Sequence, residues 1–202
     1  MLTFINLITR LKHMIDKNEF TKIREEMRKL DLKREEVIQL SREIITVSKQ
    51  VIYAAQRNDM KSAHSAIKEI KNNVKKLKKL DILTNTNINS VAIQEYVEAI
   101  SFYEFVKNKS IPTRVSLGVS AEDYLSGLCD LTGELVRKAI YEVIHKNFDE
   151  AEHIKELVHD IYGEFLKLHL RNGELRKKSD SIKWNLKKLE EVMYDVSMKV
   201  RH

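Results

Sequence analysis

Four acidic residues at helical spacing are the groups in this chain best suited to chemistry. Glu95 and Glu98 lie three residues apart in QEYVEA, and Asp130 and Glu134 lie four residues apart in DLTGE. Residues at these spacings share one face of an α-helix, so each pair would project from one side of its own helix. If the two helices packed together, the four carboxylates would meet and would need cations or protons to offset their charge.

The first acidic pair lies in an apolar setting. At ~100° per residue, Glu95 and Glu98 lie about 60° apart on a helix. The same sector carries three apolar side chains, those of Val91, Phe102 and Phe105. Because an isolated charge on such a face is costly, we expect a cation, a basic side chain or protons to accompany the pair.

The second acidic pair is flanked by two glycines, Gly127 and Gly133. Glycine inside a helix costs about 1 kcal/mol relative to alanine, so two of them require a reason. The close approach of another backbone or of a ligand would supply one. Arg137 lies at the edge of the same face, where it can clamp a phosphate or form a salt bridge to Asp130 or Glu134.

Two interpretations of the four acids follow from their chemistry. Hard oxygen donors without clustered Cys or His suit Mg²⁺ or Mn²⁺, which can activate water and offset charge on a phosphate. Alternatively, Arg137 and nearby lysines form ion pairs with these acids, since such pairs are common on helices. The spacing alone does not separate the metal site from the ion pairs.

Other catalytic patterns are weaker. Three Glu-x-x-His elements match half of a carboxylate-bridged di-iron motif; they are Glu142/His145, Glu150/His153 and Glu156/His159. The last two elements fall on one helix, where residues 150, 153, 156 and 159 each lie about 60° back from the one before, so they fan round the helix and cannot converge on one site. Ser/His/Asp arrangements, phosphate-binding glycine loops and dinucleotide fingerprints are absent.

The composition predicts an all-helical protein. Charged residues make up 33% of 202 residues and are rich in Lys and Glu, while only one Pro and five Gly are present. The formal charge is +6, and basic residues gather in two segments, 61–79 and 171–188. These segments can bind a polyanion or form solvated helix faces; beside a carboxylate cluster, they suggest a nucleic-acid substrate.

No run of about 18 apolar residues exists, so we expect no transmembrane span. The first 20 residues are typical of an amphipathic helix and not of a signal peptide. A single cysteine, Cys129, excludes an internal disulfide and fits a cytoplasmic location.

The helical period continues almost throughout the chain and predicts one domain over residues 1–202. We expect an all-α, up-and-down bundle of seven helices, with a break at Asp31, one irregular loop at 107–120 and an N-terminal cap at Ser120. The predicted helices span residues 2–29, 31–57, 59–82, 88–108, 120–146, 149–170 and 173–200.

Four stretches of the sequence together resemble the translin superfamily, which comprises translin and translin-associated factor X (TRAX). They are LSREIITVSKQVIYAAQR, QEYVEAISFYEFVKNKS, SAEDYLSGLCDLTGELVRKAI and KKLEEVMYDVSMKVR. The resemblance implies a seven-helix bundle that assembles into hollow octamers. It also implies binding of single-stranded RNA and DNA and, in TRAX-like subunits, an Mg²⁺-dependent endoribonuclease. The acids of the TRAX pattern match Glu95, Glu98, Asp130 and Glu134.

The chain also departs from both family patterns. AEDYLSG and the C-terminal tail are closer to translin, and the loop at 107–120 is shorter than in TRAX. The segment ahead of the fourth predicted helix is basic in translin, but here it reads LDILTNTNINSVA, which holds no basic residue. This mixture suggests a compact, single-gene member of archaeal type that forms a homo-oligomer.

The sequence therefore predicts a metal-dependent endoribonuclease that acts on single-stranded RNA within an oligomeric shell. Glu95, Glu98, Asp130 and Glu134 would hold Mg²⁺ or Mn²⁺, and Arg137 would contact the nucleic acid. The alternative is a non-catalytic protein that binds single-stranded RNA or DNA, with structural acidic pairs. A helical scaffold without nucleic-acid binding is the third hypothesis.

Overall fold

The structure, a computed structural model, describes residues 15–80 and 87–200, with side chains described at 15–80 and 89–198. Within these ranges the chain forms seven helices and no strand, which confirms the all-α prediction. The helices are α2 (Lys17–Gln56), α3 (Met60–Leu80), α4 (Asn87–Asn108), α5 (Arg114–Leu117), α6 (Ala121–Ile144), α7 (Phe148–Leu166) and α8 (Glu174–Val200).

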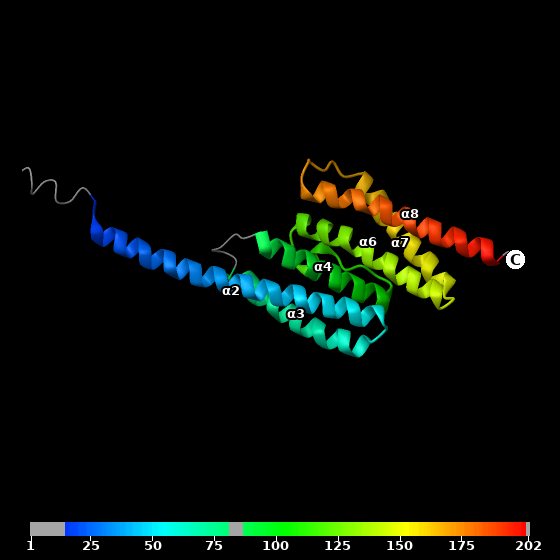
Figure 1. The fold of residues 1–202 in the computed structure, drawn as a ribbon, viewed down its shortest axis with the longest axis horizontal. Helices are drawn as coiled ribbons and strands as arrows, with labels where there is room; N and C mark the ends of the chain where they lie inside the picture. Colours follow the sequence, from blue (N-terminus) through cyan, green and yellow to red (C-terminus); the bar gives the residue numbers. More distant parts are fainter. Residues whose placement is uncertain (1–14, 81–86, 201–202) are drawn as a thin grey trace, which may run out of the picture.

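The helices form a bundle in which α4 and α6 lie in the middle (Figure 1). On one side α2 packs against both α3 and α4, and on the other side α7 and α8 pack against α6 and against each other. The central helix α4 is buried along most of its length, as its apolar sequence predicts. No helix in the described ranges is long and apolar enough to cross a membrane.

The predicted break at Asp31 is wrong. One continuous helix runs from Lys17 to Gln56, and Asp16 caps it by accepting hydrogen bonds from the backbone N–H groups of Asn18 and Glu19. Asp inside a helix costs well under 1 kcal/mol, and neither Gly nor Pro stands nearby to interrupt the backbone. The first half of the predicted helix 2–29 lies outside the described residues.

The loop predicted at 107–120 contains the one-turn helix α5, which the sequence analysis did not foresee. Thr113 caps its start, and Gly118 ends it with a φ of 64°, a left-handed conformation that favours glycine. Lys78 of α3 donates to the carbonyl oxygens of Leu117 and Gly118 and so holds the loop against the bundle. Ser120 caps α6, as predicted, by accepting from the N–H of Asp123.

This loop returns along the bundle, so α6 runs in the same direction as α4 (Figure 1). Contacts between the two helices run in the same order along both, as expected for parallel helices. Ser90 near the start of α4 donates to Asp123 near the start of α6, and Gly127 lies against Gln94 and Val97 one turn later. The next turns of both helices carry the four acids, which the parallel arrangement places beside each other.

Gly127 is the residue that allows this close approach. A Cβ atom at position 127 would lie 2.7 Å from the Cβ of Val97 and 2.8 Å from the backbone oxygen of Gln94. At Gly133 an added Cβ would lie 3.9 Å from Nδ2 of Asn185, an ordinary contact. Close approach of another helix therefore explains Gly127 and does not explain Gly133.

We expect Gly127→Ala to destabilise the protein by about 1–3 kcal/mol, because α6 must move away from α4. Gly133→Ala is the matched control and should be neutral or stabilising by up to about 1 kcal/mol, since alanine favours the helix. Urea unfolding followed by circular dichroism measures both changes. Equal stability of the two variants would contradict the assignment of Gly127 to the contact between the helices.

Candidate functional site

Glu95, Glu98, Asp130 and Glu134 come together between α4 and α6, close enough for their charges to interact. The negative charges of the other three acids all raise the pKa of Glu98, in addition to the larger effect of its burial. Local spacing places the two acids of each pair on one helix face, and the tertiary structure brings the two pairs together.

A cavity of about 440 Å³ opens beside these acids. Helix α2 forms a wall of it that the sequence analysis missed, with Lys49, Tyr53 and Gln56 among the lining side chains; Glu95, Glu98, Glu134 and Arg137 line the rest. Asp130 is not among the residues that line the cavity. The spacing of Lys49, Tyr53 and Gln56, four and three residues apart on one helix face, was the available signal.

Glu98 is the least compensated of the four acids. Its side chain is buried at 8% exposure, and it makes no hydrogen bond or ion pair with any side chain that the structure describes. Burial, followed by the charges of Glu95, Asp130 and Glu134, raises its pKa from 4.5 to about 8. The carboxyl group of Glu98 is therefore mostly protonated at pH 7.

Glu95 is less buried than Glu98, but the same two effects, burial and neighbouring acids, raise its pKa. Burial raises its pKa, the positive charge of Lys49 acts against this rise, and the charge of Asp130 adds to it. The side chain of Glu95 is half-buried and lines the cavity. Glu95 and Glu98 are thus the two acids at which a further positive charge would relieve an electrostatic cost.

The other two acids are held by basic side chains. Lys178 of α8 forms an ion pair with Asp130 and donates a hydrogen bond of 3.0 Å to Oε1 of Gln94. Arg137 donates from Nη1 to both carboxylate oxygens of Glu134, at 2.9 and 3.0 Å. Of the two roles open to Arg137 in the sequence, the structure contains the salt bridge.

Gln56 adds a link from α2 to the same acid. Its Nε2 donates to the carboxylate of Glu134 at 3.1 Å and to the backbone oxygen of Glu134 at 2.9 Å. Glu134 is therefore fixed by α2 as well as by its own helix. This contact sets the distance between the α2 wall and the acids.

The carboxylates fit a divalent cation, provided that the cation displaces the basic side chains now paired with two of them. A cation would supply the charge that Glu98 and Glu95 lack, and carboxylate oxygens are suitable ligands for Mg²⁺ and Mn²⁺. With the side chains as they stand, no three His, Cys, Asp or Glu groups among the described residues converge enough to hold a metal ion. A cation would have to compete with Lys178 for Asp130 and with Arg137 for Glu134.

The other candidates from the sequence serve packing. Glu142 is buried in an ion pair of 2.8 Å with Lys138, and Glu150 forms an ion pair with Lys109. Neither belongs to a metal-binding group among the residues that the structure describes. Cys129 is buried, and burial raises its pKa to about 12, which leaves the thiol protonated and unreactive.

Sequence comparisons place this fold among known proteins. The profile of the Translin family matches residues 32–200. Translin of Gallus gallus is 32% identical over 121 residues, which is 53% of either chain. An uncharacterized protein of the archaeon Methanocaldococcus jannaschii is 33% identical over 139 residues, which is 67% of this chain and 62% of the relative. The match thus spans about half the length of the curated translins.

Solved structures match over nearly the whole chain. The crystal structure of apo-NeC3PO aligns with a TM-score of 0.82 and 32% identity, covering 90% of this chain and 97% of that one. AfC3PO in complex with duplex RNA aligns with the same TM-score of 0.82 and the same coverage. At 22% identity, the second match shows the fold alone.

Proposed function

This chain belongs to the Translin family, and from that premise we propose that it binds single-stranded RNA and cleaves it with a divalent cation. Glu95, Glu98, Asp130 and Glu134 would hold Mg²⁺ or Mn²⁺ beside the cavity. The observation that carries the proposal is Glu98, which is buried beside three other acids and forms no hydrogen bond or ion pair with a described side chain. A structural cluster of acids would be expected to satisfy its most buried member first.

The surrounding side chains suit a phosphodiester substrate. A bound divalent cation would lower the pKa of a water and offset charge on the phosphate. Arg137 is 66% exposed at the rim and can turn its guanidinium from Glu134 to a phosphate as a two-point clamp. Lys49 on the α2 wall adds positive charge to the same cavity, and the exposed ring of Tyr53 offers a stacking surface for a base.

The second candidate is a non-catalytic protein that binds single-stranded RNA or DNA. The ion pairs from Lys178 to Asp130 and from Arg137 to Glu134 favour it, because they satisfy two of the acids without a metal. In this case the acids fix the packing of α4, α6 and α8. Basic side chains on the outer faces would then supply the affinity for nucleic acid.

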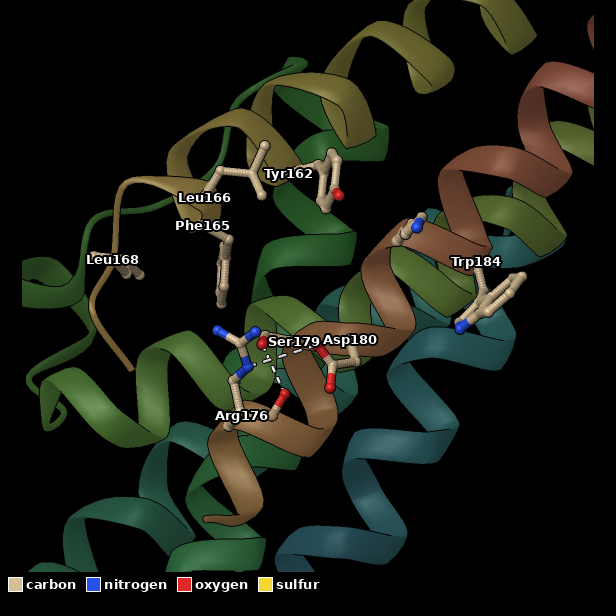
Figure 2. A pocket seen from close by; sticks show the side chains of 9 residues that line it. Tyr162, Phe165, Leu166, Leu168, Arg176, Ser179, Asp180 and Trp184 are labelled. Atoms are coloured by element: carbon tan, nitrogen blue, oxygen red, sulfur yellow. Dashed lines mark hydrogen bonds and ion pairs between the residues drawn. The ribbon is translucent and has the colours of Figure 1, made fainter. Parts of the chain in front are cut away.

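We also propose that the chain assembles into a homo-oligomer, an octamer by resemblance to its family. Its outer surface supports such contacts. Between α7 and α8 lies a hollow of about 490 Å³ (Figure 2), whose apolar lining includes Tyr162, Phe165, Leu166 and Trp184. Leu166 and Trp184 are 67% and 64% exposed. A surface that combines such apolar side chains with charged ones, here Arg176 and Asp180 in the same lining, is typical of protein contacts.

A crystal soaked in MnCl₂ tests the catalytic proposal. We expect an anomalous peak between α4 and α6, within coordinating distance of Glu98, and release of Lys178 from Asp130. A fully soaked crystal without that peak contradicts the metal site. Filter binding with a single-stranded RNA oligonucleotide separates the remaining hypotheses: salt-sensitive binding without the peak favours the non-catalytic form, and no binding at low salt contradicts both.

A further inference from the structure

The first half of α2 is a helical arm, residues 17–36, that extends beyond the bundle (Figure 1). Every side chain from residue 15 to residue 36 is exposed, whereas burial begins at Val37. Six of the exposed side chains are large and apolar, and four of these share one face of the helix: Phe20 (48%), Ile23 (42%), Met27 (53%) and Leu30 (41%). A helix of this length with no packed face is marginal in water, so the arm needs a partner.

The four apolar residues form one stripe. Their spacing alternates between three and four residues, the a and d pattern of a coiled coil. The stripe continues in the same heptad register with Val37, Ile44 and Val51, which are buried in the bundle. The face that α2 packs against α3 and α4 in the bundle therefore continues along the arm, where it is bare.

The arm is largely separate from the family fold and from the acidic site. The Translin family match begins at residue 32, so most of the arm precedes it. The cavity residues of α2 begin at Lys49, several turns further along the helix. A function of the arm is thus independent of the cleavage proposed above.

The charge of the arm indicates what kind of partner it fits. Residues 17–36 contain seven basic and six acidic side chains, nearly in balance. A segment that binds nucleic acid or an anionic membrane has a clear excess of Lys and Arg on its polar face. A partner with an apolar stripe and charges of both signs fits better, and a second copy of the arm has both.

We propose that the arm pairs with the same arm of a second copy of this chain in an antiparallel two-helix coiled coil. In the register that places Ile23 against Met27 of the second copy, Phe20 meets Leu30, and all four apolar layers are filled. The same register brings Arg34 to Asp16 at each end of the pair. In the flanking positions Glu19 lies on the side of Lys33 and Lys17 on the side of Asp31, four pairs of opposite charge in all, against one Arg24–Arg24 pair and one Glu26–Glu26 pair at the centre.

The parallel alternative is disfavoured by the same residues. It would place Arg34 on Arg34 and Asp16 on Asp16 in the core layers at the two ends, and like charges in contact are destabilising. It would also bring both bundles to the same end of the pair. The antiparallel pair keeps the two bundles at opposite ends and so joins two bodies across a helical bridge.

Disulfide trapping in the full chain tests the pairing and its direction. A Phe20→Cys/Leu30→Cys double variant should form a disulfide between copies under mild oxidation, seen as a dimer on a non-reducing gel. Positions 20 and 30 of one helix are about 15 Å apart, too far for a disulfide within one chain. The buried Cys129 leaves the unaltered chain as a clean background.

The controls use the same arm. Phe20→Cys or Leu30→Cys alone should not form dimers, because identical positions do not meet in the antiparallel register. Adding Met27→Glu to the double variant should reduce the dimer at least about tenfold, whereas adding Leu32→Glu, at an exposed apolar residue off the stripe, should not. Glu95→Ala/Asp130→Ala should not affect trapping, which keeps this test separate from the test of cleavage.

Three outcomes would overturn the proposal. The first is no dimer in the double variant at micromolar protein. The second is equal dimer formation by the single variants, which would indicate a parallel pair or random collision. The third is loss of the dimer when Leu32→Glu is added as well as when Met27→Glu is added, each on its own, which would show that the stripe is not the contact.

Discussion

Replacing Glu95 and Asp130 by alanine is expected to lower Mn²⁺-supported cleavage of single-stranded RNA at least about 100-fold. The proposed site takes ligands from both pairs, and this double variant removes one carboxylate from each, on α4 and on α6. Loss of groups that merely orient metal ligands already costs about 10- to 100-fold, and the ligands themselves should cost more. A gel assay with a labelled RNA oligonucleotide measures the rate, while filter binding measures whether the RNA still binds.

A matched control separates this effect from a general loss of charge. Glu104→Ala/Glu122→Ala removes one carboxylate from each of the same helices, but both side chains lie away from the cavity. We expect the control to cleave at the rate of the unaltered protein. Because Asp130→Ala leaves Lys178 unpaired, Glu95→Gln/Asp130→Asn should be tested as well. If a folded double variant of either kind cleaves normally, the catalytic proposal is wrong.

The second large effect is expected on stability. Glu98→Gln should stabilise the metal-free protein at alkaline pH, by up to about 5 kcal/mol, because the neutral amide avoids the cost of a buried carboxylate. The folded state raises the pKa of Glu98 from 4.5 to about 8. Below pH 4.5 the group is protonated in both states and carries no penalty. Between pH 4.5 and 8 only the unfolded state releases the proton, so stability falls as pH rises.

Denaturant unfolding at pH 5, 7 and 9 with EDTA checks this dependence. The two proteins should have similar stability near pH 5 and differ most at pH 9, where the penalty is complete. Glu104→Gln, at a carboxylate that accepts a hydrogen bond from Asn108, should follow the unaltered protein. Saturating Mn²⁺ should narrow the difference, because a bound cation favours the charged form of Glu98. A constant difference at every pH would contradict the raised pKa.

The helices themselves were largely predictable from the sequence, because helical periodicity and N-terminal caps are local signals. Ser120 illustrates this, since its capping role depends only on residues one turn away. Asp31 illustrates the limit of such signals. A residue that often starts helices lies here inside one, and the strong helix formers around it decide the outcome.

The glycines show where local signals stop. Gly127 and Gly133 are equivalent in the sequence, but only Gly127 lies against a neighbouring backbone. Which of them is needed depends on the path of the loop at 107–120, which carries the chain back and makes α6 parallel to α4. The residues of α6 itself do not determine the path of that loop.

The sequence by itself determined which acids share a helix face, because the spacing of Glu95 and Glu98, and of Asp130 and Glu134, sets their angles on an α-helix. It also determined the all-α class. Only the tertiary structure decided that the two pairs meet, that Lys178 and Arg137 hold one pair while Glu98 stays without a partner, and that α2 walls the cavity. Those features depend on contacts between residues far apart in the chain, and such contacts arise from packing and not from spacing.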